Sequence, residues 1–216
     1  MAAKPVLYTY WRSSCAWRVR IALALKGIDY ESNIVHLVKD GGQQHTEGYK
    51  KLNPMEQLPC LLIDGQTLFQ SLPIIEYLNE TRPDVKLLPD DPVLRHKARA
   101  LAEIVNCGIQ PLQNLEVLQA IGDDKKMEWS KRWIEKGFDA FEQVVTETAG
   151  KYSVGDQVTL PDLCLVPQVY NANRFKADMS RYPTISRIHA ELMQLPAFKV
   201  ADAHNQPDTP EAERKQ

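Results

Sequence analysis

The pattern of hydrophobic residues changes once along this chain, at a proline-rich stretch between Arg82 and Pro92. Before this stretch, short apolar runs typical of strands alternate with helix-like runs, and after it only helical spacing is found. A chain of 216 residues is long enough to form two small domains. We therefore expect a first domain over residues 1–82, a linker over 83–91 and a helical domain over 92–216.

The first domain is expected to contain a small mixed sheet. Its expected elements are, in chain order, a strand over residues 4–10, a helix to about residue 26, a strand over 30–37, strands over 60–63 and 67–69, and a helix over 71–81. Asp64-Gly65 lies between two apolar runs, which is a strong signal for a β-hairpin. Ser71 is expected to cap the helix that follows. This βαβ-ββα order predicts an α/β domain whose first two strands are parallel.

The second domain is expected to be all-helical. Apolar residues recur at helical spacing over 94–118, and Pro111 lies inside this run, so we expect a long helix with a kink near Cys107. The sequence Thr159-Leu160-Pro161-Asp162 is similar to a capping box, with Asp where Glu or Gln is usual, and predicts the start of another helix. The polar tail, residues 205–216, is expected to fray.

A cluster of small polar residues follows the first strand. Ser13, Ser14 and Cys15 stand where the first helix should begin, and Gly27 stands where it should end in the left-handed conformation. The unpaired N–H groups and the dipole of a helix N-terminus favour an anion, either a phosphate or a thiolate. One serine could simply cap the helix. Three such side chains in a row exceed what a cap needs, so the turn is a candidate site.

Composition narrows the classes of function. The hydrophobic fraction of 44% and the charged fraction of 25% are ordinary for a soluble globular protein, and a net charge of −2 argues against nucleic-acid or membrane-surface binding. No apolar run has membrane-spanning length, and the first residues are unlike a signal peptide. The four cysteines are widely spaced, which indicates free thiols in a reducing compartment and so a cytoplasmic protein. The scattered histidines predict no metal site.

Motifs in both domains resemble those of one enzyme family. They are Leu58-Pro59 before the hairpin, Gln70-Ser71 at the next helix, residues 159–162, residues 13–20 (Ser-Ser-Cys-Ala-Trp-Arg-Val-Arg), residues 108–115, and Asn173-Arg174-Phe175. With the order of the domains, the first three resemble the cytosolic glutathione transferases over essentially the whole chain. The last three resemble the zeta class of that family. The resemblance implies a thioredoxin-like N-terminal domain followed by an all-α C-terminal domain.

The resemblance also implies residues that bind the cofactor glutathione. They are Ser13, Ser14, Cys15, Ala16, Trp17, Arg18, Gln44, Leu58, Gln70, Ser71, Gln110, Asn114, Leu115 and Glu116. Ser13 would activate the glutathione thiol, and Ser14 and Cys15 would shape the same catalytic anion site. Leu58 would act through its main chain, before a cis Pro59, because a residue held extended by a following proline can pair with a peptide backbone.

Other matching residues are implied to face the substrate. Arg174 would bind a carboxylate of the substrate in a two-point contact, with Gln110 beside it. Gln110 and Asn114 are four residues apart, so we expect them on one face of the long helix.

The resemblance implies an activity as well. Zeta-class enzymes isomerise maleylacetoacetate to fumarylacetoacetate, a step of tyrosine and phenylalanine catabolism, and they also act on α-halo acids. We therefore expect a glutathione-dependent homodimeric enzyme that acts on a maleylacetoacetate-like dicarboxylate and needs no metal.

Two other functions remain open. A dehydroascorbate reductase or glutaredoxin-like enzyme of the same fold would use Cys15 as its nucleophile. A non-catalytic binding module would use the fold as a scaffold, although the presence of Ser13, Gln70 and Ser71 together argues against a degenerate site.

Overall fold

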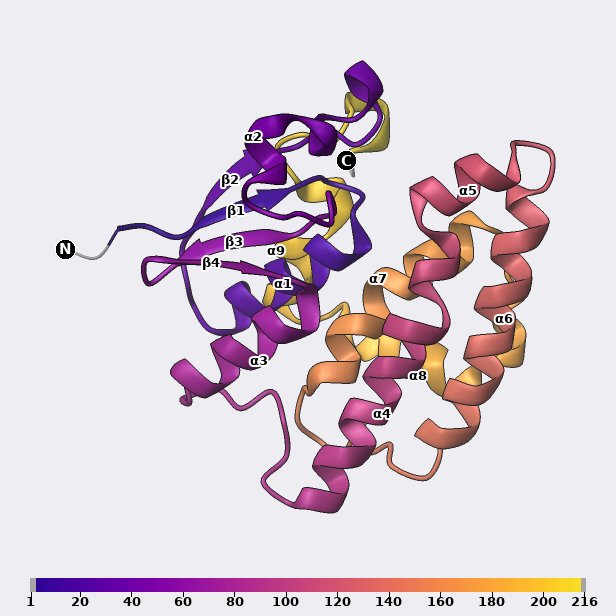
Figure 1. Cartoon of the computed structure of the whole chain (residues 1–216). Helices are drawn as coiled ribbons and strands as arrows, with labels where there is room; N and C mark the ends of the chain where they lie inside the picture. The colour runs from indigo at the N-terminus through magenta and orange to yellow at the C-terminus, as the bar shows by residue number, and fades with distance from the viewer. Residues whose placement is uncertain (1–2, 215–216) are drawn as a thin grey trace. The chain divides into compact units, whose positions relative to one another are not determined.

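A computed structural model describes residues 3–214 and divides the chain into two compact units (Figure 1). The first unit is Met1–Val85 together with Pro196–Gln216, and the second is Lys86–Leu195. The domain boundaries expected from the sequence were placed where the type of secondary structure changes, whereas these two units are defined by which residues contact one another. The C-terminal segment, which composition grouped with the helical domain, therefore belongs by its contacts to the first unit.

The first unit contains the small mixed sheet expected from the sequence. Its elements are β1 (Val6–Thr9), α1 (Ser14–Leu25), β2 (Glu31–Ile34), α2 (Glu47–Lys50), β3 (Cys60–Ile63), β4 (Gln66–Phe69), α3 (Ser71–Thr81) and α9 (Pro196–Ala201). The strands lie in the order β2-β1-β3-β4. β1 pairs with β2 in parallel and with β3 in antiparallel, and β3 pairs with β4 in antiparallel. This arrangement confirms the βαβ-ββα order.

Local signals explain where these elements begin and end. Asp64 and Gly65 adopt left-handed φ angles of 52° and 72° in the turn between β3 and β4, as the hairpin signal predicted. Gly27, at φ 63°, follows the end of α1. The cap of α3 differs from our expectation by one residue. Gln70, at φ 69°, is the N-cap, and Ser71 is the first helical residue.

Helix α1 is buried on several sides, because it packs against both α3 and α9. Its apolar residues Val19, Ile21 and Leu23 are fully buried. The same helix also buries Arg18 and Arg20, which are 0% and 1% exposed. A buried arginine is costly unless its donors are satisfied, so both side chains need polar partners inside this unit.

The second unit is helical, as expected. Its helices are α4 (Pro92–Gly108), α5 (Leu115–Ile121), α6 (Lys126–Val145), α7 (Leu160–Arg174) and α8 (Pro183–Leu192). Helix α4 packs against α6 and α7, and α8 packs against the same two helices. Phe138 and Phe141 of α6 are fully buried in the core of this unit. No helix in the described part of the chain is long and apolar enough to cross a membrane.

The expected long helix with a kink is wrong, because the helix ends. Helix α4 stops at Gly108, and residues Gln110–Gln113 form a 3-10 turn that contains Pro111. The break allows Ile109, which is 0% exposed, to pack against Gly137 of α6. A Cβ on Gly137 would lie 2.2 Å from the Ile109 side chain, so the close approach needs glycine there. Pro111 has no backbone N–H and so cannot donate a helical hydrogen bond. The packing of Ile109 against Gly137 accounts for the complete break after α4.

The expectation of a frayed tail is also wrong for the residues that the structure describes. After α9, 3-10 turns form at Ala203–Asn205 and Glu211–Glu213. Ala203, Gln206 and Thr209 are buried. The Thr209 hydroxyl donates to the Ala203 carbonyl at 2.6 Å. The polar residues of this segment thus satisfy one another and the first unit, and do not simply face water.

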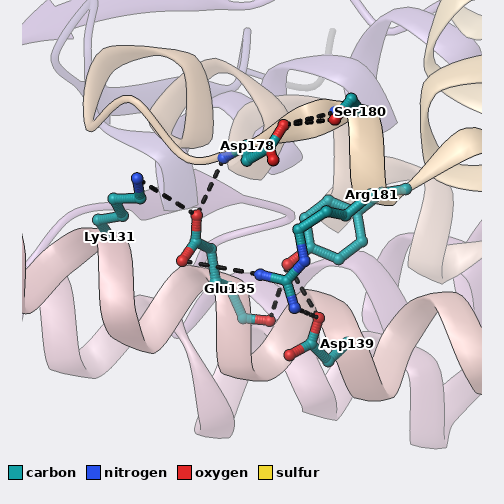
Figure 2. A network of polar contacts seen from close by, with 7 residues as sticks. Lys131, Glu135, Asp139, Asp178, Ser180 and Arg181 are labelled. Atoms are coloured by element: carbon teal, nitrogen blue, oxygen red, sulfur yellow. Dashed lines mark hydrogen bonds and ion pairs between the residues drawn. The ribbon is translucent and has the colours of Figure 1, made fainter.

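A polar network fixes the turn between α7 and α8 against α6 (Figure 2). Glu135 accepts from the backbone N–H of Asp178 at 3.0 Å, and Arg181 donates to Asp139 at 2.7 Å. The hydroxyl of Tyr182 donates to the same Asp139 oxygen at 3.0 Å. The ion pairs are exposed and contribute little energy individually. They join the segment after α7 to helix α6.

Candidate functional site

The turn between β1 and α1 places Ser13 at the N-cap of α1. Its backbone is extended, and its Oγ accepts a hydrogen bond from the backbone N–H of Ala16 at 3.2 Å. The N–H of Ser13 donates to the carbonyl of Tyr10 at 3.0 Å. Since the Ser13 Oγ serves as an acceptor within the cap, its own hydrogen can be donated to a further group. Capping and anion binding are therefore compatible at this residue.

The next two polar residues lie in the first turn of α1. Ser14 is its first residue and is 8% exposed, and Cys15 is a free thiol that is partly exposed. Both residues are close to the N-terminal end of the helix dipole. The structure therefore brings Ser13, Ser14 and Cys15 to the helix start, as the sequence indicated.

Three residues expected near glutathione are buried. Ala16, Trp17 and Arg18 are 0%, 2% and 0% exposed. Ala16 participates through its backbone, as the donor to Ser13. Arg18 donates from Nη1 to the hydroxyl of Ser71 at 3.1 Å and so links the starts of α1 and α3. The Arg18 side chain thus supports the start of α3 from inside the unit.

The start of α3 is a second position that favours an anion. Gln70 is exposed in the left-handed conformation, and the buried Ser71 opens the helix. The N-terminus of this eleven-residue helix carries the positive end of its dipole. The buried guanidinium of Arg18 adds a full positive charge behind Ser71. Both features suit a carboxylate.

The loop before β3 contains the expected cis peptide bond between Leu58 and Pro59. The carbonyl of Gln57, just before it, accepts from the Tyr49 hydroxyl and from Asn53 Nδ2, each at 2.7 Å. Tyr49 and Asn53 are 4% and 1% exposed. Burial raises the pKa of Tyr49 well above its ordinary value, so the hydroxyl remains a donor. Sequence reasoning missed both residues, because the local sequence gives no sign that Tyr49, in α2, and Asn53, after it, are buried.

Gln44 is 5% exposed and lies in the 3-10 turn Gln43–His45. Its Nε2 lies 2.9 Å from His45 Nε2. Its Oε1 is buried and, within the described residues, has no hydrogen-bond partner. A buried acceptor without a partner is costly, and a peptide N–H from a ligand would satisfy it. This position thus fits a peptide-like cofactor.

The residues expected from the long helix are distributed differently in the second unit. Gln110 begins the 3-10 turn, and Asn114 caps α5 by accepting from the N–H of Glu116 at 3.1 Å. Leu115 is the first residue of α5. The expectation that Gln110 and Asn114 share a face of one helix is therefore wrong, because α4 ends before either residue. Gln113, between them, donates to the buried Gln168 of α7 at 2.6 Å.

Arg174 is the last residue of α7 and is exposed. Its guanidinium lies 4.8 Å from the centre of the Phe175 ring. A guanidinium over an aromatic face keeps a defined orientation. This geometry is compatible with a carboxylate contact.

Comparisons with known proteins agree with the two-unit architecture. Models of the glutathione S-transferase N-terminal and C-terminal domains match residues 12–81 and 116–200. The chain is 57% identical to a maleylacetoacetate isomerase of Mus musculus over 209 residues, with 97% of each chain covered. It is 54% identical to a probable maleylacetoacetate isomerase 2 of Drosophila melanogaster, with 96% of this chain and 91% of the relative covered.

Solved structures give the same result. A maleylacetoacetate isomerase from Anaeromyxobacter dehalogenans with bound glutathione superposes with a TM-score of 0.88 at 43% identity, covering 97% of this chain and all of the other. A bacterial zeta-class maleyl pyruvate isomerase superposes with a TM-score of 0.91 at 41% identity, covering 95% of this chain and all of the other.

Proposed function

Because this chain belongs to the glutathione transferase family, in its zeta class, we propose that it isomerises maleylacetoacetate to fumarylacetoacetate with glutathione as cofactor. The observation that carries the proposal is the N-cap of α1. Ser13 accepts from Ala16 within the cap, and its hydroxyl hydrogen remains available to a thiolate at the positive end of the helix. An enzyme that uses glutathione needs such a donor.

Isomerisation requires a carbon–carbon double bond to become single for long enough to rotate. When bound, glutathione supplies a thiolate that can add to the conjugated cis alkene and leave again as the trans alkene forms. The protein must therefore raise the fraction of thiolate, hold the substrate carboxylates and stabilise negative charge next to the reacting carbon. Histidine bases and metals are not required for any of these tasks.

The free energy needed to raise the fraction of thiolate can be compared with what the protein supplies. A thiol with a pKa of ~8.5 is only a few per cent ionised near neutral pH, and lowering its pKa by about two units takes roughly 2.7 kcal/mol. A charge-assisted hydrogen bond from Ser13 contributes ~1.5–3 kcal/mol. The N-terminus of α1 contributes ~0.3–1 kcal/mol. Together these two effects contribute ~1.8–4 kcal/mol, a range that includes the required free energy.

Residues of the first unit would hold the rest of the cofactor. The start of α3, with Ser71 in front of Arg18, suits the carboxylate of the γ-glutamyl end, with Gln70 beside it. The main chain of Leu58 would pair with the cysteinyl backbone. Gln44 would accept a peptide N–H through its buried Oε1. These roles extend the family pattern to this chain residue by residue.

Residues of the second unit would bind the substrate. Arg174 would hold one carboxylate, and Gln110 would contact the substrate and cofactor. Asn114, Leu115 and Glu116, at the start of α5, would contact glutathione. We also propose that the enzyme acts in tyrosine and phenylalanine catabolism in the cytoplasm, accepts α-halo acids and forms a homodimer.

The test is an isomerisation assay on the cis substrate analogue maleylacetone, followed by proton NMR. We expect conversion to the trans isomer with glutathione and no conversion without it. Equal rates with and without glutathione would contradict the proposal.

The partly exposed thiol of Cys15 favours a second function, a thiol-redox enzyme that forms a mixed disulfide at this residue. Cys15→Ala separates the two functions. We expect the variant to retain substantial isomerase activity, because the attacking sulfur belongs to glutathione. Loss of isomerisation with intact glutathione binding, or a stable mixed disulfide with reductase turnover by mass spectrometry, would favour the redox enzyme.

A further inference from the structure

The backbone of Trp11, two residues before Ser13, is held from both sides by charged side chains. Its carbonyl accepts from Nη2 of Arg20 at 3.0 Å. Its N–H donates to Oδ2 of Asp208 at 2.8 Å. Arg20 lies in α1, whereas Asp208 lies in the C-terminal segment, 197 residues after Trp11. The turn that leads to Ser13 is thus fixed between α1 and the end of the chain.

Arg20 has uncharged oxygens as its acceptors. Its Nη1 donates to the Thr9 hydroxyl at 3.1 Å and to the Tyr10 carbonyl at 3.3 Å, and its Nε donates to the Ala201 carbonyl of α9 at 3.1 Å. Burial lowers the pKa of Arg20 to about 10, and the negative charge of Asp208 acts in the opposite direction. The guanidinium therefore stays cationic at neutral pH and binds the β1–α1 turn and α9 together.

One of these contacts leads directly to Ser13. The Tyr10 carbonyl that accepts from Arg20 also accepts from the N–H of Ser13 at 3.0 Å. A cation on a carbonyl increases its polarity and strengthens the second hydrogen bond that it accepts. Arg20 thereby acts on the position of Ser13 through a single shared oxygen.

The segment that carries Asp208 is itself well fixed. Asp202 accepts from the N–H of His204 at 2.9 Å, and Gln206 Nε2 donates to the carbonyl of Asp202 at 2.8 Å. The ring of His204 lies 6.4 Å from that of Trp11. Asp208 is therefore presented to Trp11 by an ordered segment. A frayed tail would not hold a carboxylate at one backbone N–H.

From this geometry we propose that Arg20 and Asp208 are positioning residues for the turn between β1 and α1 that carries Ser13. The C-terminal segment, residues 196–214, thereby contributes to thiol activation in the glutathione site. The proposal rests on the proposed role of Ser13. Neither residue needs to touch glutathione. Their effect is to hold the Ser13 hydroxyl where it can donate to the thiolate, because small displacements of a catalytic group greatly reduce its effect.

The test compares three full-length variants. Asp208→Ala removes the acceptor for Trp11. Asp208→Asn keeps an acceptor oxygen at the same place. Glu211→Ala is the matched control, since it removes an exposed carboxylate three residues further along the same segment. For each variant, the thiolate of bound glutathione is titrated by its ultraviolet absorbance, and kcat/KM for maleylacetone is measured from neutral to alkaline pH.

We expect Asp208→Ala to raise the pKa of the bound thiol and to lower kcat/KM about tenfold near neutral pH, the loss of one charge-assisted contact. The difference in kcat/KM between Asp208→Ala and the wild type should decrease as the pH rises, because the thiol then ionises without a lowered pKa. Asp208→Asn should recover most of the loss, and Glu211→Ala should match the wild type. A purely structural role would instead lower activity equally at every pH.

Three results would count against the proposal in different ways. If wild-type glutathione is activated but Asp208→Ala titrates like the wild type with equal kcat/KM, this inference alone is overturned. If glutathione bound to the wild type titrates like free glutathione, the proposed thiol activation fails, and the positioning role fails with it. An equal loss at all pH values, with a lowered melting temperature, would also overturn it.

Discussion

At the scale of single residues, Ser13 both caps α1 and is proposed to donate its hydroxyl hydrogen to the glutathione thiolate, and a set of substitutions separates these two roles. Ser13→Ala removes both the cap and the hydroxyl. We expect it to raise the pKa of bound glutathione by about one to two units, the equivalent of one charge-assisted hydrogen bond, and to lower turnover at neutral pH. Ultraviolet titration of the thiolate measures the shift.

Two further variants control for the loss of the cap. Ser13→Gly retains most of the capping stability but has no hydroxyl, and Ser13→Thr keeps both. Ser13→Gly should titrate like Ser13→Ala, and Ser13→Thr like the wild type. A titration curve that is unchanged in Ser13→Ala would transfer the role to Ser14 or to the helix dipole alone.

Arg174 gives the second prediction at this scale. If its guanidinium grips a substrate carboxylate, Arg174→Ala should raise KM for maleylacetone far more than KM for glutathione. Loss of a charge-assisted contact of ~1.5–3 kcal/mol corresponds to a roughly 10- to 150-fold lower kcat/KM. Arg174→Lys should recover only part of this, because an ammonium group cannot make the two-point contact.

A neutral electrophile provides the control for Arg174. Chlorodinitrobenzene has no carboxylate, so its turnover should hardly change in Arg174→Ala. Equal losses on both substrates, with a lowered melting temperature, would show that the residue has a structural role.

At the scale of elements, the start of α7 is held by one buried carboxylate. Asp162 is 0% exposed and accepts from the N–H of Ser153 at 2.9 Å, and from the N–H and hydroxyl of Thr159 at 2.7 and 3.1 Å. Burial raises the pKa of Asp162, and these hydrogen bonds act in the opposite direction. The carboxylate thus ties the preceding loop to the helix.

Asp162→Ala would leave these donors buried without partners. Each such group costs about 1–3 kcal/mol, so we expect the free energy of unfolding to fall by about 3 kcal/mol or more. Urea denaturation followed by circular dichroism measures the change. Asp162→Asn, which keeps one acceptor oxygen, should lose less. A loss below about 1 kcal/mol in Asp162→Ala would contradict the role given to this cap.

Turns and helix ends that depend on neighbouring residues could be predicted from the sequence. The Asp64-Gly65 turn, the glycine after α1 and the polar start of α1 depend on residues a few positions apart. The end of α4 was not predictable in this way. Pro111 indicated a disturbance, but a break in place of a kink depends on Ile109 packing against Gly137, which lies 28 positions away in the sequence.

At the scale of the whole molecule, the errors concern contacts between distant parts of the chain. The tail was expected to fray because it is polar. Its Asp208 instead accepts a hydrogen bond from Trp11, which lies 197 residues earlier in the chain. Arg18 and Arg20 are charged residues in an otherwise apolar helix, which was only a weak indication that they need buried polar partners. The candidate residues of each unit could be predicted from motifs. The hydrogen bond from Arg18 to Ser71 could not, because the two residues are 53 positions apart in the sequence.

In the proposed mechanism, glutathione acts as a catalyst and is returned after each turnover. The most direct test is a proton NMR time course of maleylacetone with the wild-type enzyme and a small fraction of one equivalent of glutathione. We expect complete conversion to the trans isomer, with the glutathione thiol unchanged at the end. Conversion that stops after one equivalent per glutathione, or that accumulates glutathione disulfide, would contradict it.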